Sequence, residues 1–168
     1  MAKVARAVSG AATALNARLQ TSGYDSNPDL VGKRRQMSTE RPVTVESSFP
    51  HEETVQRLEA AVREAGMTPF ANIDHSAGAA GVGLALRPTQ VLIFGNPRAG
   101  ILLIQDDRKV GIDLPLRALI WQDDNDRTWV SYIEPAELAK QYGITNREDL
   151  LSKMGQSVEL AVERATKL

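Results

Sequence analysis

The chain has 168 residues, of which 42% are hydrophobic and 24% are charged, and its formal net charge is −1. These values are typical of one soluble globular domain with a sizeable core, and they exclude a strongly basic nucleic-acid binder. There is no cysteine, which excludes disulfides and thiolate chemistry and favours a reducing, cytoplasmic location. The apolar runs are far shorter than the roughly 20 residues that span a bilayer, so no membrane protein is predicted.

Charge is unevenly distributed along the chain. Residues 1–36 carry a net charge of +4, and residues 37–168 therefore carry −5. Apolar residues within 1–20 fall near one face of a weak helix, and the glycines and prolines of residues 21–42 indicate a linker. We predict a basic extension over residues 1–40, either disordered or upstream of a natural start at Met37, followed by a single domain over residues 41–168. An organellar targeting peptide is the alternative for the extension.

The domain opens with a strand and a helix. Val43–Ser47 alternates apolar and polar residues, which predicts a strand with one buried face. A helix is then predicted from Ser48 or Phe49, with Pro50 in its first turn, where no intrahelical hydrogen bond is lost. Apolar residues repeat at helical spacing as far as Gly66, which fits a left-handed C-terminal stop.

The middle of the domain has two further apolar segments. We predict a strand at Phe70–His75, a loop as far as Pro88 and a second strand at Gln90–Gly95. Asn96-Pro97 has the pattern of an N-cap followed by the first residue of a helix, and it predicts a short helix that continues through Gln105.

The last part of the domain predicts a hairpin and two helices. Strands over residues 114–122 and 127–133 flank an acidic four-residue loop. A short helix is predicted from Pro135 to Gly143, and a final amphipathic helix follows a capping box of Thr145 and Glu148. The order is strand, helix, four strands, helix. It predicts an α+β fold, with helices packed on a mainly antiparallel sheet of about five strands.

Several phrases, in order from about Pro42 to Leu168, resemble hallmark segments of the domain-of-unknown-function 302 family. They are Ile73-Asp74-His75, Leu86-Arg87-Pro88-Thr89, Ile93-Phe94-Gly95-Asn96-Pro97, Ala99-Gly100, Asp113-Leu114-Pro115-Leu116, Leu119-Ile120-Trp121 and Trp129-Val130-Ser131-Tyr132. The resemblance implies a domain of the TATA-box-binding-protein-like fold group and a homodimer. It implies no activity, because the family's biochemical role is not settled and a fold group shared with a DNA binder does not imply DNA binding.

Polar residues at the ends of the predicted strands are the first site candidates. Asp74 is expected to cap the Gly/Ala-rich segment that follows it or to hold Arg87. His75 is the histidine placed to titrate inside the domain, whereas His51 is expected to be solvated. For His75, a structural bond to a backbone carbonyl and a ligand-contacting or acid–base role both remain open.

Asn96 and Arg98 form a candidate anion site. Free N–H groups at a helix start and a guanidinium can together meet a carboxylate or phosphate. Simple capping by Asn96, with Arg98 in solvent, is the alternative. Asp113 is expected to pair with Arg87, Arg98 or Arg117.

We predict a small-ligand-binding domain with a cleft for a polar or anionic molecule. The residues expected to line it are Asp74, His75, Arg87, Asn96, Arg98 and Asp113. One alternative is an enzyme that uses His75 as its acid or base, with Asp74 as the second catalytic candidate. The other is a structural or protein-interaction domain without a ligand. Neither a metal site nor nucleic-acid binding is predicted, and no cofactor can be named, because the Gly78-x-x-Gly81-x-Gly83 pattern is not a dinucleotide fingerprint.

Overall fold

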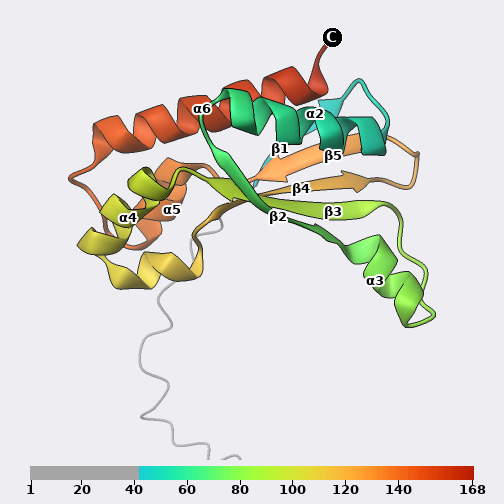
Figure 1. Cartoon of the computed structure of the whole chain (residues 1–168), viewed down its shortest axis with the longest axis horizontal. Coiled ribbons are helices and arrows are strands. Elements are labelled where there is room, and N and C mark those ends of the chain that lie inside the picture. The colour runs from blue at the N-terminus through green and yellow to red at the C-terminus, as the bar shows by residue number, and fades with distance from the viewer. Residues whose placement is uncertain (1–41) are drawn as a thin grey trace, which may run out of the picture. The chain divides into compact units, whose positions relative to one another are not determined.

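The computed structural model describes residues 42–168, which form an α+β domain (Figure 1). Five strands make one antiparallel sheet in the order β1-β5-β4-β3-β2, which confirms the predicted fold class. The strands are β1 (Val43–Ser47), β2 (Thr68–Asp74), β3 (Thr89–Gly95), β4 (Leu116–Gln122) and β5 (Thr128–Tyr132). The predicted basic extension lies outside the described residues, and its boundary with the domain stays a prediction.

Two long helices cover one face of this sheet. In Figure 1, α2 and α6 lie side by side along the sheet, and the two helices contact each other directly. The helices are α2 (His51–Glu64), α3 (His75–Gly81), α4 (Pro97–Asp106), the 3-10 helix η2 (Arg108–Ile112), α5 (Pro135–Gln141) and α6 (Glu148–Thr166). The predicted short helices after Asn96 and after Pro135 are confirmed as α4 and α5.

The core fills the space between the sheet and the α2–α6 layer. Phe94 of β3, Ile120 of β4 and Val130 of β5 are at most 1% exposed, and Leu58 of α2 and Val158 of α6 are buried with them. Since strand side chains alternate between faces, the residues between them point away from the helices. Burying these apolar side chains supplies the main stabilisation of the domain.

Three local predictions are wrong. The segment predicted as a loop up to Pro88 contains the helix α3. Helix α2 begins at His51, and Pro50 before it is an extended N-cap with φ −57° and ψ 157° rather than part of the first turn. Helix α6 begins at Glu148 without a side-chain capping hydrogen bond, so the predicted capping box is absent.

A fourth prediction, that His51 is solvated, is also wrong. Its ring is half-buried, and Nε2 lies 3.2 Å from the carbonyl oxygen of Ile120. This hydrogen bond ties the first turn of α2 to the central strand β4.

Candidate functional site

The six residues predicted to line one cleft lie in two groups. At roughly 3.3 Å per residue, β3 runs about 20 Å from Thr89 to Gly95. One group, near the start of β3, is Asp74, His75 and Arg87, and the other, beyond its end, is Asn96, Arg98 and Asp113. The sheet therefore separates the predicted residues instead of bringing them together.

Asp74 caps α3. Its Oδ1 accepts hydrogen bonds from the Ala77 backbone N–H at 2.9 Å and from the Ser76 hydroxyl at 2.8 Å. These bonds, the one from Ala77 foremost, lower the pKa of the Asp74 carboxyl because they favour its charged form. Of the two roles expected for Asp74, the structure shows the capping one.

The other two residues of this group have no shared partner. Arg87 pairs with Asp126 and, at 3.4 Å, with Asp124, both in the β4–β5 hairpin loop. His75 is the first residue of α3 and is exposed. Because Asp74 is engaged in capping and Arg87 in ion pairs, this end of the sheet does not present a ready set of catalytic groups.

At the other end of β3, Asn96 caps α4. Its Oδ1 accepts hydrogen bonds from the backbone N–H groups of Arg98 at 3.0 Å and Ala99 at 3.3 Å. Pro97 occupies the first helical position, as the sequence predicts. The Arg98 side chain is exposed.

Asp113 forms a small network before β4. Its Oδ1 accepts a hydrogen bond from Arg117 at 3.0 Å, and its Oδ2 accepts one from the Tyr142 hydroxyl. The bond to Asp113 is the main reason that the pKa of Tyr142 is raised. Among the three arginines expected as partners, the structure selects Arg117.

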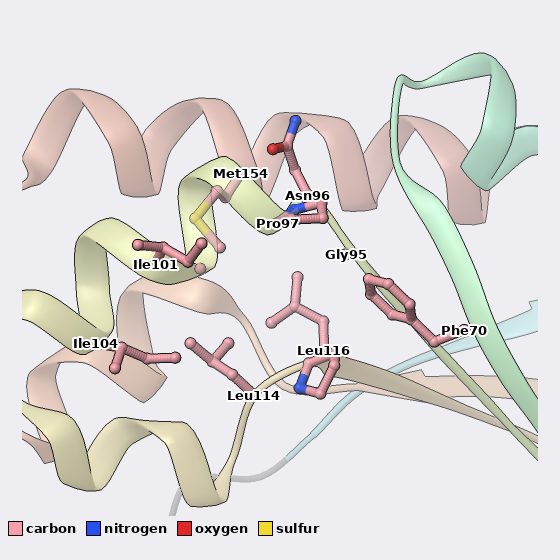
Figure 2. A pocket seen from close by; sticks show the side chains of 11 residues that line it. Phe70, Gly95, Asn96, Pro97, Ile101, Ile104, Leu114, Leu116 and Met154 are labelled. Carbon is pink, nitrogen blue, oxygen red and sulfur yellow. The ribbon is translucent and has the colours of Figure 1, made fainter.

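An apolar pocket opens beside Asn96, between the sheet end, α4 and α6. It has a volume of about 190 Å³, and Figure 2 shows Ile101, Leu114 and Leu116 pointing into the same space. The lining residues are Phe70, Gly95, Asn96, Pro97, Gly100, Ile101, Ile104, Leu114, Pro115, Leu116 and Met154. Asn96 is the only one of the six predicted site residues among them.

Two glycines line this pocket. A Cβ atom on Gly100 would lie 3.9 Å from Leu114 Cδ1, so a larger side chain there would extend toward the pocket wall. A Cβ atom on Gly95 would lie 3.8 Å from both Phe70 and Pro115. A Cβ atom at either glycine would thus make ordinary van der Waals contacts, and only a longer side chain would reach into the space.

Sequence reasoning missed this pocket because it searched for polar groups. The signal was nonetheless present, since Gly95-Asn96-Pro97, Gly100 and Leu114-Pro115-Leu116 belong to the segments that carry the family resemblance. Seven of the eleven lining residues come from these segments. The pocket is therefore where those separate motifs meet.

A second hollow adjoins the first. It has a volume of about 230 Å³ and shares Asn96, Leu116 and Met154 with the apolar pocket. Its remaining walls come from α6, from Ala99 of α4 and from the turn between α2 and β2. Lys153 is its only charged lining residue.

An uncharged arm extends at the opposite end of the sheet. Residues 75–86 contain no Asp, Glu, Lys or Arg, and α3 has no buried residue. Val82, Leu84 and Leu86 after it are 73%, 67% and 49% exposed. In Figure 1, α3 projects beyond β2, away from α2 and α6. A seven-residue helix is far below the ~12–15 residues that are marginally stable alone in water.

The sheet face that points away from α2 and α6 is also apolar. It presents Val91 and Ile93 of β3 beside Leu119 and Trp121 of β4, all only partly buried. The Trp121 ring stacks on Trp129 of β5, with ring centroids 6.2 Å apart and an angle of 24° between planes. Within residues 42–168, this face and the arm are both apolar surfaces with exposed or only partly buried side chains.

Two further features of the domain concern metal binding and membrane insertion. In the described part of the chain, no group of three or more His, Cys, Asp or Glu side chains lies close enough to hold a metal ion. None of the described helices has the length and apolar character needed to cross a bilayer.

The fold and sequence match known proteins. The family model with the description "Domain of unknown function DUF302" matches residues 43–163. An uncharacterised conserved DUF302 protein from Bacillus stearothermophilus superposes with a TM-score of 0.67 at 19% identity, over 74% of this chain and 97% of that one. At this identity, the structural likeness shows the fold alone.

Two curated relatives bear the name of an ion channel. Proteins named Fluoride-specific ion channel FluC 1 from Brucella suis and Brucella abortus are each 43% identical to this chain over 111 residues. The match covers 66% of this chain but only 44% and 41% of those proteins. The chain thus spans less than half the length of these relatives.

Proposed function

We propose a function from the geometry of the pocket, because this chain belongs to the DUF302 family, which is described only as a domain of unknown function. The proposal is that the domain binds a small ligand whose apolar part fills the pocket between α4, α6 and the ends of β3 and β4. The observation that carries it is the coincidence of the apolar pocket with the motif segments. The channel name of the curated relatives belongs to proteins that extend well beyond the match, and the proposal does not rest on it.

The size and chemistry of the pocket support this function. A dry cavity of about 150 Å³ lined by aliphatic and aromatic side chains is large enough to bind benzene, and this pocket is larger, at about 190 Å³. Its lining is almost entirely aliphatic or aromatic, so an apolar group gains more from entering than water does. The lining therefore favours an apolar group over the polar or anionic molecule expected from the sequence.

The test is a titration of the full chain with 1-hexanol, followed by NMR of the isoleucine, leucine and methionine methyl groups. We expect saturable shifts at Ile101, Leu114 and Met154. Gly100→Leu should abolish them, because a side chain at this position extends toward Leu114. The helix itself should tolerate leucine, which is a better helix former than glycine.

Gly155→Leu on α6 is the matched control. A Cβ atom there meets nothing within 4 Å, and Gly155 does not line the pocket. This variant should bind hexanol as the natural sequence does. Shifts that persist in Gly100→Leu, or that spread over the surface without saturating, would contradict the proposal.

The arm (residues 75–86) and the sheet face that points away from α2 and α6, here called the open face, support a second function, self-association. The arm carries no charge. The face combines its apolar side chains with Arg117, which lies beside Ile93, and Arg127, which lies over the Trp129 ring, so both surfaces offer apolar area for contact. In a two-fold dimer the arm of each copy would pack on the face of its partner and close the assembly.

Sedimentation of the full chain tests the dimer. We expect a dimer at micromolar concentration and a folded monomer for Leu84→Glu, because a carboxylate would be buried without a partner. Leu160→Glu on α6, where the leucine is 43% exposed, is the control and should remain dimeric. A monomeric natural chain, or a Leu84→Glu dimer of unchanged affinity, rules this interface out.

Among the residues that the structure describes, His75 is exposed and Asp74 caps a helix, which gives the enzyme alternative less support than these two. The cytoplasmic location and the absence of nucleic-acid and membrane partners stay predictions.

A further inference from the structure

We propose that the ligand is an amphiphile, with an anionic head held by Asn96 and Lys153 and a short apolar chain in the pocket. This inference rests on the proposed function and adds the chemical class of the ligand. It is carried by the donors that line the second hollow and by the continuity of the two hollows.

Asn96 supplies a free hydrogen-bond donor. Its Oδ1 is occupied by the N–H groups of Arg98 and Ala99, so the orientation of the amide is fixed. Its Nδ2 has no hydrogen-bond partner among residues 42–168. Figure 2 shows the amide directed toward α6, away from the apolar side chains that point into the pocket. The cap thus directs an NH₂ group, with two donors, toward the second hollow.

Lys153 supplies the charge. Its side chain lines the second hollow, and no carboxylate of the described residues lies within ion-pair distance of its ammonium. Among the other described lysines, Lys140 and Lys167 each have a glutamate within 4 Å, whereas Lys109 has no such partner. An ammonium and an amide NH₂ are both donors, and together they complement a carboxylate rather than a cation or a hydrogen-bond donor.

The two hollows meet at shared walls. Leu116 and Met154 line both, together with Asn96. Met154 is an unbranched side chain with three rotatable bonds, so it can adjust to let a chain pass from one hollow to the other. A ligand with its head at Lys153 would therefore place its alkyl chain among Ile101, Ile104 and Leu114.

Calorimetry of the full chain with hexanoate, 1-hexanol and hexyltrimethylammonium tests the head group. We expect hexanoate to bind about tenfold or more tightly than hexanol, since a hydrogen bond to a charged group is worth that factor. Hexyltrimethylammonium, which carries a positive head, should bind more weakly than hexanol. Lengthening the carboxylate from butanoate to hexanoate should tighten binding by about fourfold per methylene.

Asn96→Asp is the sharpest variant, because aspartate caps a helix as well as asparagine does but lacks the donors. We expect it to lose the preference for hexanoate over hexanol. Lys153→Gln should reduce the same preference. Asn125→Asp in the hairpin loop and Lys140→Gln on α5 are matched controls, and both should keep the preference for hexanoate over hexanol.

The outcomes separate this inference from the proposed function. Saturable hexanol binding with equal or weaker hexanoate binding overturns the amphiphile and leaves the apolar pocket standing. A carboxylate preference that survives both Asn96→Asp and Lys153→Gln also overturns it. Failure of every probe to bind, in the natural chain and the controls alike, overturns the ligand pocket itself.

Discussion

Asp123 fixes the β4–β5 hairpin with both carboxylate oxygens. Oδ1 accepts hydrogen bonds from the backbone N–H groups of Asn125 at 2.9 Å and Arg127 at 3.0 Å. Oδ2 accepts bonds from the Arg127 side chain at 2.8 Å and from Trp129 Nε1 at 3.1 Å. Partial burial alone would raise the pKa of Asp123, but these bonds outweigh it and lower the pKa to about 2.

This shift predicts acid sensitivity at one residue. The folded pKa lies below the unfolded value, so the stabilisation is complete above about pH 4 and is lost as the pH falls toward 2. In urea unfolding of Asp123→Asn between pH 5 and 2, we expect a less stable protein at pH 5 and a shallower loss of stability on acidification. Parallel pH profiles for the variant and the natural chain would contradict this account.

At the scale of elements, glycine ends the helices in a recurring way. Gly66 after α2 has φ +74°, and Gly143 after α5 has φ +69°. The N–H of Met67 bonds to the carbonyl of Val62, while the N–H of Gly66 bonds to that of Arg63, which is the Schellman pattern. The predicted left-handed stop at Gly66 is confirmed.

Replacing Gly66 tests this stop. Gly66→Ala should lower the free energy of unfolding by about 1 kcal/mol, because its positive φ strains a residue with a Cβ atom. Gly155→Ala, in the interior of α6, should act in the opposite direction by a similar amount. Urea unfolding of both variants measures the contrast, and effects of the same sign would exclude this explanation.

The elements also show what the sequence could predict. The alternation in Val43–Ser47 correctly predicted the strand β1, and the helical spacing before Gly66 correctly predicted the helix α2. Both patterns arise because one face of each element is buried against the core. Helix α3 has no buried residue and hence no apolar periodicity, so its pattern could not be distinguished from a loop. The capping box before α6 failed because Arg147, rather than Thr145, is the N-cap.

At the scale of the molecule, the site depends on tertiary contacts that no local pattern contains. The pocket joins the end of β3, two turns of α4, the segment before β4 and Met154 of α6. Sequence reasoning placed Asn96 at a helix start but grouped it with Asp74 and Arg87. The register of β3 puts those residues at the opposite end of the sheet.

The pocket also predicts a linkage between ligand and stability for the whole domain. A ligand that binds only the folded state raises the free energy of unfolding by about 2.7 kcal/mol at a hundredfold excess over Kd. The midpoint temperature of thermal unfolding of the natural chain should therefore rise when hexanoate is added. Gly100→Leu should be insensitive to it, and an equal rise in both proteins would contradict the pocket as the binding site.

The central claim is that the space between Gly100, Leu114 and Met154 binds a ligand. The most direct measurement is the heat of titrating 1-hexanol into the full chain, with Gly100→Leu and Gly155→Leu titrated side by side. The account predicts one saturable site in the natural chain and in Gly155→Leu, and none in Gly100→Leu. Identical isotherms for all three proteins would contradict it.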